Sequence, residues 1–269
     1  GTLPAQPGTW SGQTAGLRSG DLLLSMEGIA FPSGQDTAGL RDFQDRIAAR
    51  STGDTVTLAF ERLPVRGALP TFADEVCTAA ADGSARCTAR VTLSAFPDID
   101  FLALFVIPYV TGIVALAIGA LLLLFHGGQL AARLSAAATL CFAGFCMTYF
   151  DLNTTQQLTR LWLTCAVMLG AMLTVIALVF PMPLLIVRSR PFLRYIPTVS
   201  GFLLSGVVVL LHENAATPRS AIIGLWVAPA IAISANLFFA FMMLRRRRQA
   251  PTLVLRDQAN TMLLGMGLG

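Results

Sequence analysis

The sequence predicts a multi-domain chain in which a small α+β domain precedes a polytopic α-helical transmembrane bundle. Of the 269 residues, 55% are hydrophobic and only 13% are charged, whereas about a quarter of an ordinary soluble domain is charged. Residues 1–100 hold eight arginines and twelve acids, but residues 101–269 hold eleven arginines and three acids among long apolar runs. We therefore expect a folded domain over residues 1–98 and a membrane bundle over residues 101–269.

The first domain is predicted to contain short strands, tight turns and one helix. A turn at Gly20-Asp21 leads into a strand over residues 22–26, which ends at Glu27-Gly28. Helical spacing then predicts an amphipathic helix whose apolar side chains are Leu40, Phe43, Ile47 and Ala48. Alternation predicts strands over residues 55–62 and 89–96. Their expected inward side chains are Val56, Leu58 and Phe60, and Val91, Leu93 and Ala95.

Two cysteines flank a predicted hairpin in the segment 63–88, which we interpret as an insertion before the last strand. Cys77 and Cys87 lie on either side of Ala81-Asp82-Gly83, a sequence suited to a three-residue hairpin loop. In that register Cys77 faces Cys87, so a cross-strand disulfide is geometrically feasible and would require an oxidising compartment. The alternative is two unpaired thiols in a loop.

The second part contains apolar runs long enough to cross a bilayer, since a hydrocarbon core about 30 Å thick needs about 20 helical residues. We place five spans at residues 101–125, 134–150, 161–187, 196–211 and 220–244, and the start of a sixth at about 260–269. The chain begins without methionine and stops in an apolar run, so we expect it to be truncated at both ends.

Arginine placement predicts the orientation, because positive residues in short loops stay on the cytoplasmic side. Arginines gather after the first, third and fifth spans, and the two intervening loops carry one each, balanced by an acid. The gathered residues are Arg133, Arg188, Arg190, Arg194, Arg245, Arg246, Arg247 and Arg248. We therefore expect a multi-pass membrane protein with residues 1–100 extracytoplasmic and the lipid bilayer as a partner.

The run Arg245–Arg248 has three interpretations: a nucleic-acid patch, an anionic-lipid site, or a stop signal at the end of a span. Its position directly after a span favours the stop signal, with headgroup contact alongside it. The first domain carries no cluster of cations, so we expect no nucleic-acid partner.

Catalysis is not expected within this chain. An intramembrane zinc protease needs His-Glu-x-x-His, but His212-Glu213-Asn214-Ala215-Ala216 lacks the second imidazole. The only other histidine is His126, so we expect no metal site and no cofactor. No charged residue lies centrally in a predicted span, which argues against a proton-coupled transporter. Gly112, Gly119, Gly144 and Gly170 are expected to be helix-packing points.

The motif Ala15-Gly16-Leu17-Arg18-Ser19-Gly20-Asp21 and the landmarks that follow it resemble a bacterial PDZ domain. Those later landmarks are Glu27-Gly28, Gly53-Asp54-Thr55-Val56 and Arg62, and they come in the order typical of that family. The resemblance covers residues 15–62 and implies a peptide or protein partner at the first domain. The upstream strand and the carboxylate-binding loop are absent or reduced to residues 1–13, although peptide capture by strand addition needs them.

The bundle resembles the multi-helix membrane region of bacterial sensors, such as quorum-responsive sensor histidine kinases and membrane-tethered serine phosphatases. The residues that carry this resemblance are Val179-Phe180-Pro181-Met182-Pro183, Tyr195-Ile196-Pro197 and Arg256-Asp257-Gln258-Ala259-Asn260. It implies signal transduction, most readily in a two-component system, through an effector domain that this chain lacks. It also implies a hinge at Pro181 and Pro183 and leaves a homodimer open. The alternative is a non-enzymatic PDZ-containing membrane scaffold, or a secretion or transport component.

Overall fold

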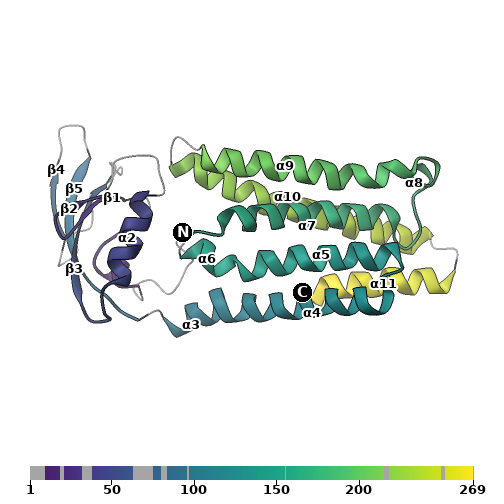
Figure 1. Cartoon of the computed structure of the whole chain (residues 1–269), viewed down its shortest axis with the longest axis horizontal. Coiled ribbons are helices and arrows are strands. Elements are labelled where there is room, and N and C mark those ends of the chain that lie inside the picture. Colours follow the sequence, from purple (N-terminus) through teal and green to yellow (C-terminus); the bar gives the residue numbers. More distant parts are fainter. Residues whose placement is uncertain are drawn as a thin grey trace. The chain divides into compact units, whose positions relative to one another are not determined.

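The computed structural model divides into two compact units, residues Gly1–Leu104 and Phe105–Gly269 (Figure 1). The structure describes residues 10–18, 21–31, 38–62, 75–79, 84–95, 97–154, 156–214, 218–249 and 252–268. Among the predicted features, Gly20 and the hairpin loop 81–83 lie outside these residues. The expected order of an α+β head followed by a helical bundle is confirmed.

The head is built on one five-stranded antiparallel sheet in the order β2-β1-β3-β5-β4. Its strands are β1 (Leu22–Met26), β2 (Ile29–Ala30), β3 (Thr55–Arg62), β4 (Glu75–Ala79) and β5 (Ala85–Thr92). Strand β4 pairs along β5 with Cys77 opposite Cys87, the register expected from the hairpin. The last strand therefore begins four residues earlier than predicted and forms half of the hairpin that we had assigned to an insertion.

The core of the head lies on one face of this sheet. Val56, Leu58 and Phe60 of β3 are buried as their alternation predicts, together with Cys87, Ala89 and Val91 of β5. Phe43 and Ile47 of helix α2 (Ala38–Ala48) pack against these residues, and the short helix α1 (Ser11–Thr14) precedes β1. Two predicted inward residues are exposed: Ala48 ends α2, and Ala95 lies beyond the end of β5.

Two turns of the head require glycine because of backbone conformation. Gly28 has φ 77° and Gly53 has φ 99°, in the left-handed region that side chains rarely adopt. A Cβ at either position would meet nothing within 4 Å. Conformation, and not space, therefore explains these two glycines.

The bundle contains five helical segments that are long and apolar enough to cross a membrane, counted over the described residues: Asp98–His126, Leu130–Asn153, Thr159–Val179, Pro191–Glu213 and Ile223–Gln249. The first comprises α3 (Asp98–Phe101), the π-helical turn η1 (Leu102–Val106) and α4 (Ile107–His126), and the second α5 (Leu130–Met147) and α6 (Tyr149–Asn153). Then follow α7 (Thr159–Val179), α8 (Leu185–Ser189), the 3₁₀ turn η2 (Pro191–Tyr195), α9 (Ile196–Glu213), α10 (Pro218–Gln249) and α11 (Leu253–Leu268).

Two predicted boundaries in the bundle are wrong. The third span was expected to reach residue 187, but α7 ends at Val179, two residues before Pro181. Proline lacks the N–H of the helical ladder and disfavours helix in the residue before it. Helix α11 begins at Leu253, about seven residues before the predicted start of the sixth span.

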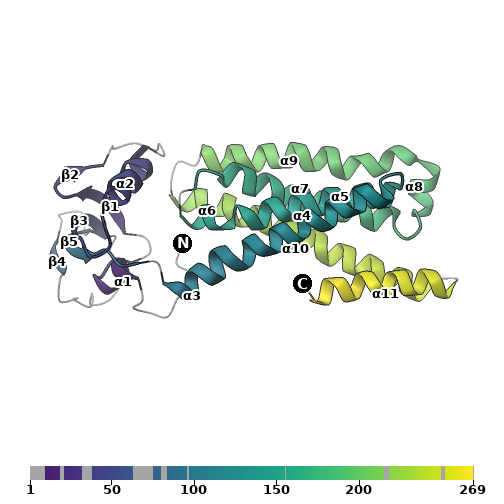
Figure 2. The ribbon, with the colours of Figure 1, turned by 60° about the horizontal axis from the view of Figure 1, so that its bottom comes forward.

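Helix α7 is the centre of the bundle. It packs against α5, α9 and α10, whereas α4 packs on α5 and α11 packs on α10 (Figures 1 and 2). In the most apolar 18-residue stretch of α7, 61% of the residues are buried inside the bundle. The corresponding share in the other four segments is 17–28%. A Cβ added at Gly170 of α7 would lie 3.3 Å from the Ala235 Cβ and 3.4 Å from the Ala232 Cα of α10, so glycine allows the two helices to pack closely here.

Candidate functional site

Segments far apart in the sequence meet at the end of the bundle where α4, α7 and α10 finish (Figures 1 and 2). We call this the arginine end. It contains nine arginines, which lie in the first turn of α5, between α7 and α9, at the end of α10 and in the first turn of α11: Arg133, Arg188, Arg190, Arg194, Arg245, Arg246, Arg247, Arg248 and Arg256. Phe180, Leu184, Met262 and Leu263 pack here against one buried cluster. This meeting of α7, α10 and α11 is the candidate site, which we call the junction.

The chain leaves α7 in an extended conformation at Phe180 (φ −110°, ψ 145°), and the Phe180-Pro181 peptide bond is cis. The backbone N–H of Phe180 still donates to Ile176, at 2.8 Å. The carbonyl of Leu178 accepts the N–H of Leu184 at 3.1 Å. These two hydrogen bonds satisfy backbone groups of the last turn of α7. The residues with the two prolines, 181–183, are not part of the helix.

Arg246 of α10 reaches back to this helix end. It is half-buried, and its Nη2 donates to the Leu178 carbonyl at 3.1 Å. The last carbonyls of a helix have no intrahelical partner and carry the negative end of the dipole, so a guanidinium is favourable there. Its neighbours Arg245, Arg247 and Arg248 are exposed. One arginine of the predicted stop signal thus ties α10 to α7.

An open pocket of about 380 Å³ lies beside this contact. Its lining comes from the α7 exit and from one stretch of α11: Phe180, Val254, Asp257, Gln258, Thr261 and Met262. Phe180 belongs to one motif that the sequence singled out, and Asp257 and Gln258 belong to another. The fold brings these two motifs together.

Half of the residues in the buried cluster are methionines, and two residues that line the pocket, Phe180 and Met262, pack against this cluster. Met168 and Met172 of α7 and Met242 and Met243 of α10 are buried, and Met262 of α11 packs against them. Methionine side chains are flexible and polarisable, and they adapt to irregular surroundings. A cluster of this composition is of the kind that tolerates changes in packing.

The sequence did not distinguish Arg246 from its three neighbours, although a signal was present. Phe239, Met242 and Met243 are buried, and the spacing 239, 242, 243, 246 follows one face of a helix. Continuing this helical spacing into the run Arg245–Arg248 would have predicted that Arg246 is the arginine on the packed face of α10. Its acceptor on α7, 68 residues away, has no local signal.

The opposite end of the bundle holds an ion pair that the sequence analysis missed. Arg160, in the first turn of α7, pairs with Glu213 at the end of α9. Asp151 instead accepts the N–H of Leu158 at 2.6 Å. The loop after the second span and the loop after the fourth span are therefore joined by an ion pair, in addition to each having one arginine and one acid.

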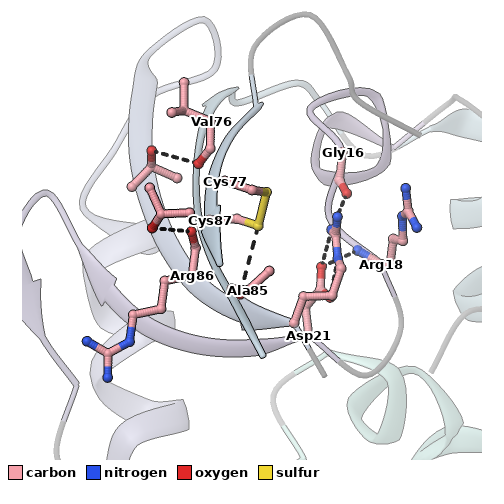
Figure 3. The surroundings of a disulfide bond; sticks show 11 residues. Gly16, Arg18, Asp21, Val76, Cys77, Ala85, Arg86 and Cys87 are labelled. Atoms are coloured by element: carbon pink, nitrogen blue, oxygen red, sulfur yellow. Dashed lines mark hydrogen bonds and ion pairs between the residues drawn. A yellow bond between two sulfur atoms is a disulfide. The ribbon is translucent and has the colours of Figure 1, made fainter. Parts of the chain in front are cut away.

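In the head, Gly16, Arg18 and Asp21 meet the end of β3 in a polar network (Figure 3). Arg62 Nε and Nη2 donate to the two carboxylate oxygens of Asp21 at 2.9 and 2.7 Å, and Nη2 also donates to the Gly16 carbonyl at 2.8 Å. The Arg18 N–H donates to the same carboxylate at 2.9 Å. The Arg62 and Asp21 side chains are only 3% and 5% exposed. These residues hold the end of β3 to the start of β1.

Cys77 and Cys87 form a disulfide between β4 and β5 (Figure 3). Cys87 belongs to the buried core of the head, and Cys77 is exposed at the edge strand. The other edge strand, β2, has two residues.

Over the described ranges, no three His, Cys, Asp or Glu side chains lie close enough together to hold a metal ion.

The fold and the apolar helices define a multi-pass membrane protein with an α+β head. No family model, curated protein or solved structure matches this chain.

Proposed function

We propose that this chain is the sensory and signal-transducing N-terminal part of a bacterial membrane sensor, with a histidine kinase as the first candidate for its effector. The observation that supports this most is the junction, where the exit of α7, Arg246 and α11 meet at a methionine-rich cluster. A peptide or protein partner would bind the PDZ-like head, and α11 would transmit the resulting change.

A sensor needs two conformations with different affinities for its stimulus. The junction offers an element that can have two arrangements, because α11 packs on α10 and contributes most of the lining of an open pocket. The Arg246–Leu178 hydrogen bond would hold one arrangement. Movement of α7 along its axis would break that bond and change the surface presented to α11.

The orientation that we propose places the head outside the cytoplasm and the arginine end inside it. Nine arginines and one aspartate belong to the arginine end, which is the bias of cytoplasmic loops. The Cys77–Cys87 disulfide suits an oxidising compartment.

Coupling between head and junction can be tested in this chain by placing two spin labels at Met182→Cys and Gln258→Cys, both exposed positions. The three free cysteines, Cys141, Cys146 and Cys165, are replaced by alanine and the disulfide is kept. Arg62→Ala disrupts the buried network of the head. We expect it to change the distance distribution between the labels, measured by pulsed electron paramagnetic resonance in nanodiscs.

The matched control is Arg90→Ala, an exposed arginine on β5 of the same head. It should leave the distribution unchanged. Identical distributions in both variants would contradict signalling from head to junction and would favour a scaffold whose head and bundle act independently.

A further inference from the structure

The connection between α7 and α9 carries both cations and exposed apolar side chains. Residues 185–195, which comprise α8, Arg190 and η2, include three arginines and no acid. Arg188 and Arg190 are exposed. Leu185 is 84% exposed, Phe192 58% and Tyr195 56%. Large apolar side chains exposed beside a membrane-length helix suit the bilayer interface, where aromatic rings and arginines are enriched.

Arg194 and Tyr195 form a fixed pair within this connection. Arg194 Nη2 donates to the Tyr195 hydroxyl at 2.6 Å, and the guanidinium carbon lies 4.7 Å from the ring centroid. Tyrosine has an apolar ring and a polar tip, which suits it to the boundary between acyl chains and headgroups. The Arg194–Tyr195 pair would therefore lie at the level of the lipid headgroups.

The charge at this end is unbalanced within the described residues. Arg194 and Arg246 are held by protein contacts, but Arg133, Arg188, Arg190, Arg245, Arg247, Arg248 and Arg256 are exposed. No ion pair to an acid is found for these seven arginines in the described ranges. Asp257 is the only acid of the arginine end.

We propose that residues 185–195, together with the exposed arginines of α10, bind the phosphate groups of anionic phospholipids in the adjacent leaflet. Leu185 and Phe192 would enter the acyl region while Arg188 and Arg190 contact headgroups. A zwitterionic lipid carries a compensating cation, so the net positive charge of this surface selects anionic lipids of the phosphatidylglycerol class. The proposed lipid contact does not depend on the pocket of the junction, and it would form whether or not the chain transmits a signal.

The test measures how strongly spin-labelled phosphatidylglycerol, relative to phosphatidylcholine, associates with the full chain in vesicles. We expect preference for the anionic lipid, weaker at high salt because exposed charges are screened. Arg188→Gln plus Arg190→Gln should reduce the preference by up to roughly fivefold per arginine. The matched control, Arg50→Gln plus Arg90→Gln, removes two exposed arginines from the head and should leave it unchanged.

Three results would overturn the proposal. The first is equal preference in the two double variants, and the second is a preference that salt does not alter. The third is displacement of the labelled lipid by inorganic phosphate beyond that caused by chloride at equal ionic strength, because the site would then bind free phosphate. Unchanged helix content by circular dichroism shows that the glutamine variants remain folded.

The depth of the connection is tested separately with an environment-sensitive fluorophore at Leu185→Cys, with the three free cysteines replaced by alanine. Apolar emission in anionic vesicles, protected from iodide, is expected. Emission typical of water, with full quenching by iodide, would contradict insertion.

Discussion

At the scale of single residues, Arg62 at the end of β3 binds Asp21, which directly precedes β1. Its guanidinium makes two hydrogen bonds to Asp21 and one to the Gly16 carbonyl, and it lies 5.2 Å from the Phe60 ring centroid. Both charges of this pair are almost fully buried. Removing one partner of such a pair leaves the other charge uncompensated, which is more costly than the loss of a surface contact.

We predict that Arg62→Ala destabilises the head by about 3–5 kcal/mol. Hydrogen exchange of the β3 amides in the detergent-solubilised chain measures this loss as faster exchange. Arg90→Ala, on an exposed face of β5, is the control and should change the exchange by little. Equal exchange in the two variants would show that the buried network does not stabilise the head.

Two glycines of α9 provide a comparison of packing inside the bundle. A Cβ at Gly201 would lie 2.6 Å from the Ala171 Cβ on α7, whereas a Cβ at Gly206 would meet nothing within 4 Å. The Ala171 Cβ is attached to the backbone of the central helix and cannot rotate away. Gly201 was not among the glycines singled out from the sequence.

We predict that Gly201→Val lowers the stability of the bundle by about 1–3 kcal/mol through overpacking. Gly206→Val changes helix propensity in the same way without the steric contact, so the difference between the variants isolates packing. Thermal unfolding in detergent measures both. Equal midpoints would contradict close approach of α9 and α7 at Gly201.

At the scale of elements, the end of α7 depends on two prolines. The hydropathy of residues 180–187 continues that of the span, which is why the sequence predicted a longer helix. Pro181 and Pro183 cannot donate backbone hydrogen bonds. The chain leaves the helix at Phe180 before Met182 can donate to Leu178, and the Leu178 carbonyl accepts from Leu184 and from Arg246 instead.

We predict that Pro181→Ala plus Pro183→Ala lets α7 extend past Val179. The N–H of Met182 could then donate to Leu178 as in a regular helix, in competition with Arg246. Slower hydrogen exchange over residues 182–187 is the expected result. Unchanged exchange would mean that packing, and not proline, ends α7.

At the scale of the whole molecule, the distribution of arginine predicts which side of the membrane each end of the bundle faces. The arginine end has nine arginines and one acid, whereas Asp151, Arg160, Glu213 and Arg219 balance one another at the opposite end. We expect Ser94→Cys in the head and Ser189→Cys at the end of α8, both exposed, to face opposite sides.

A membrane-impermeant maleimide tests this in vesicles of known orientation, with the three free cysteines replaced by alanine. Ser94→Cys should react in right-side-out vesicles and Ser189→Cys only in inside-out vesicles. Labelling of both from one side would contradict a head outside and an arginine end inside. The Gly201 and proline comparisons would be unaffected, because they concern packing within the bundle.

Local patterns predicted much of the fold. The strand over residues 55–62, its three buried residues and the Cys77–Cys87 register follow from alternation and from one loop length. Five spans follow from apolar length. Helix ends were predicted less well, because hydropathy does not change where a proline stops a helix or where α11 starts among polar residues.

The sequence by itself determined that a charged α+β head precedes a bundle of apolar helices with its arginines at one end, because these properties depend on composition and local spacing. Only the tertiary structure decided that α7 is central, that Arg246 ties α10 to α7, and that Phe180 and Asp257 line one pocket. The physical reason is that lipid and a neighbouring helix are similarly apolar, so hydropathy does not distinguish a lipid-facing side chain from a packed one.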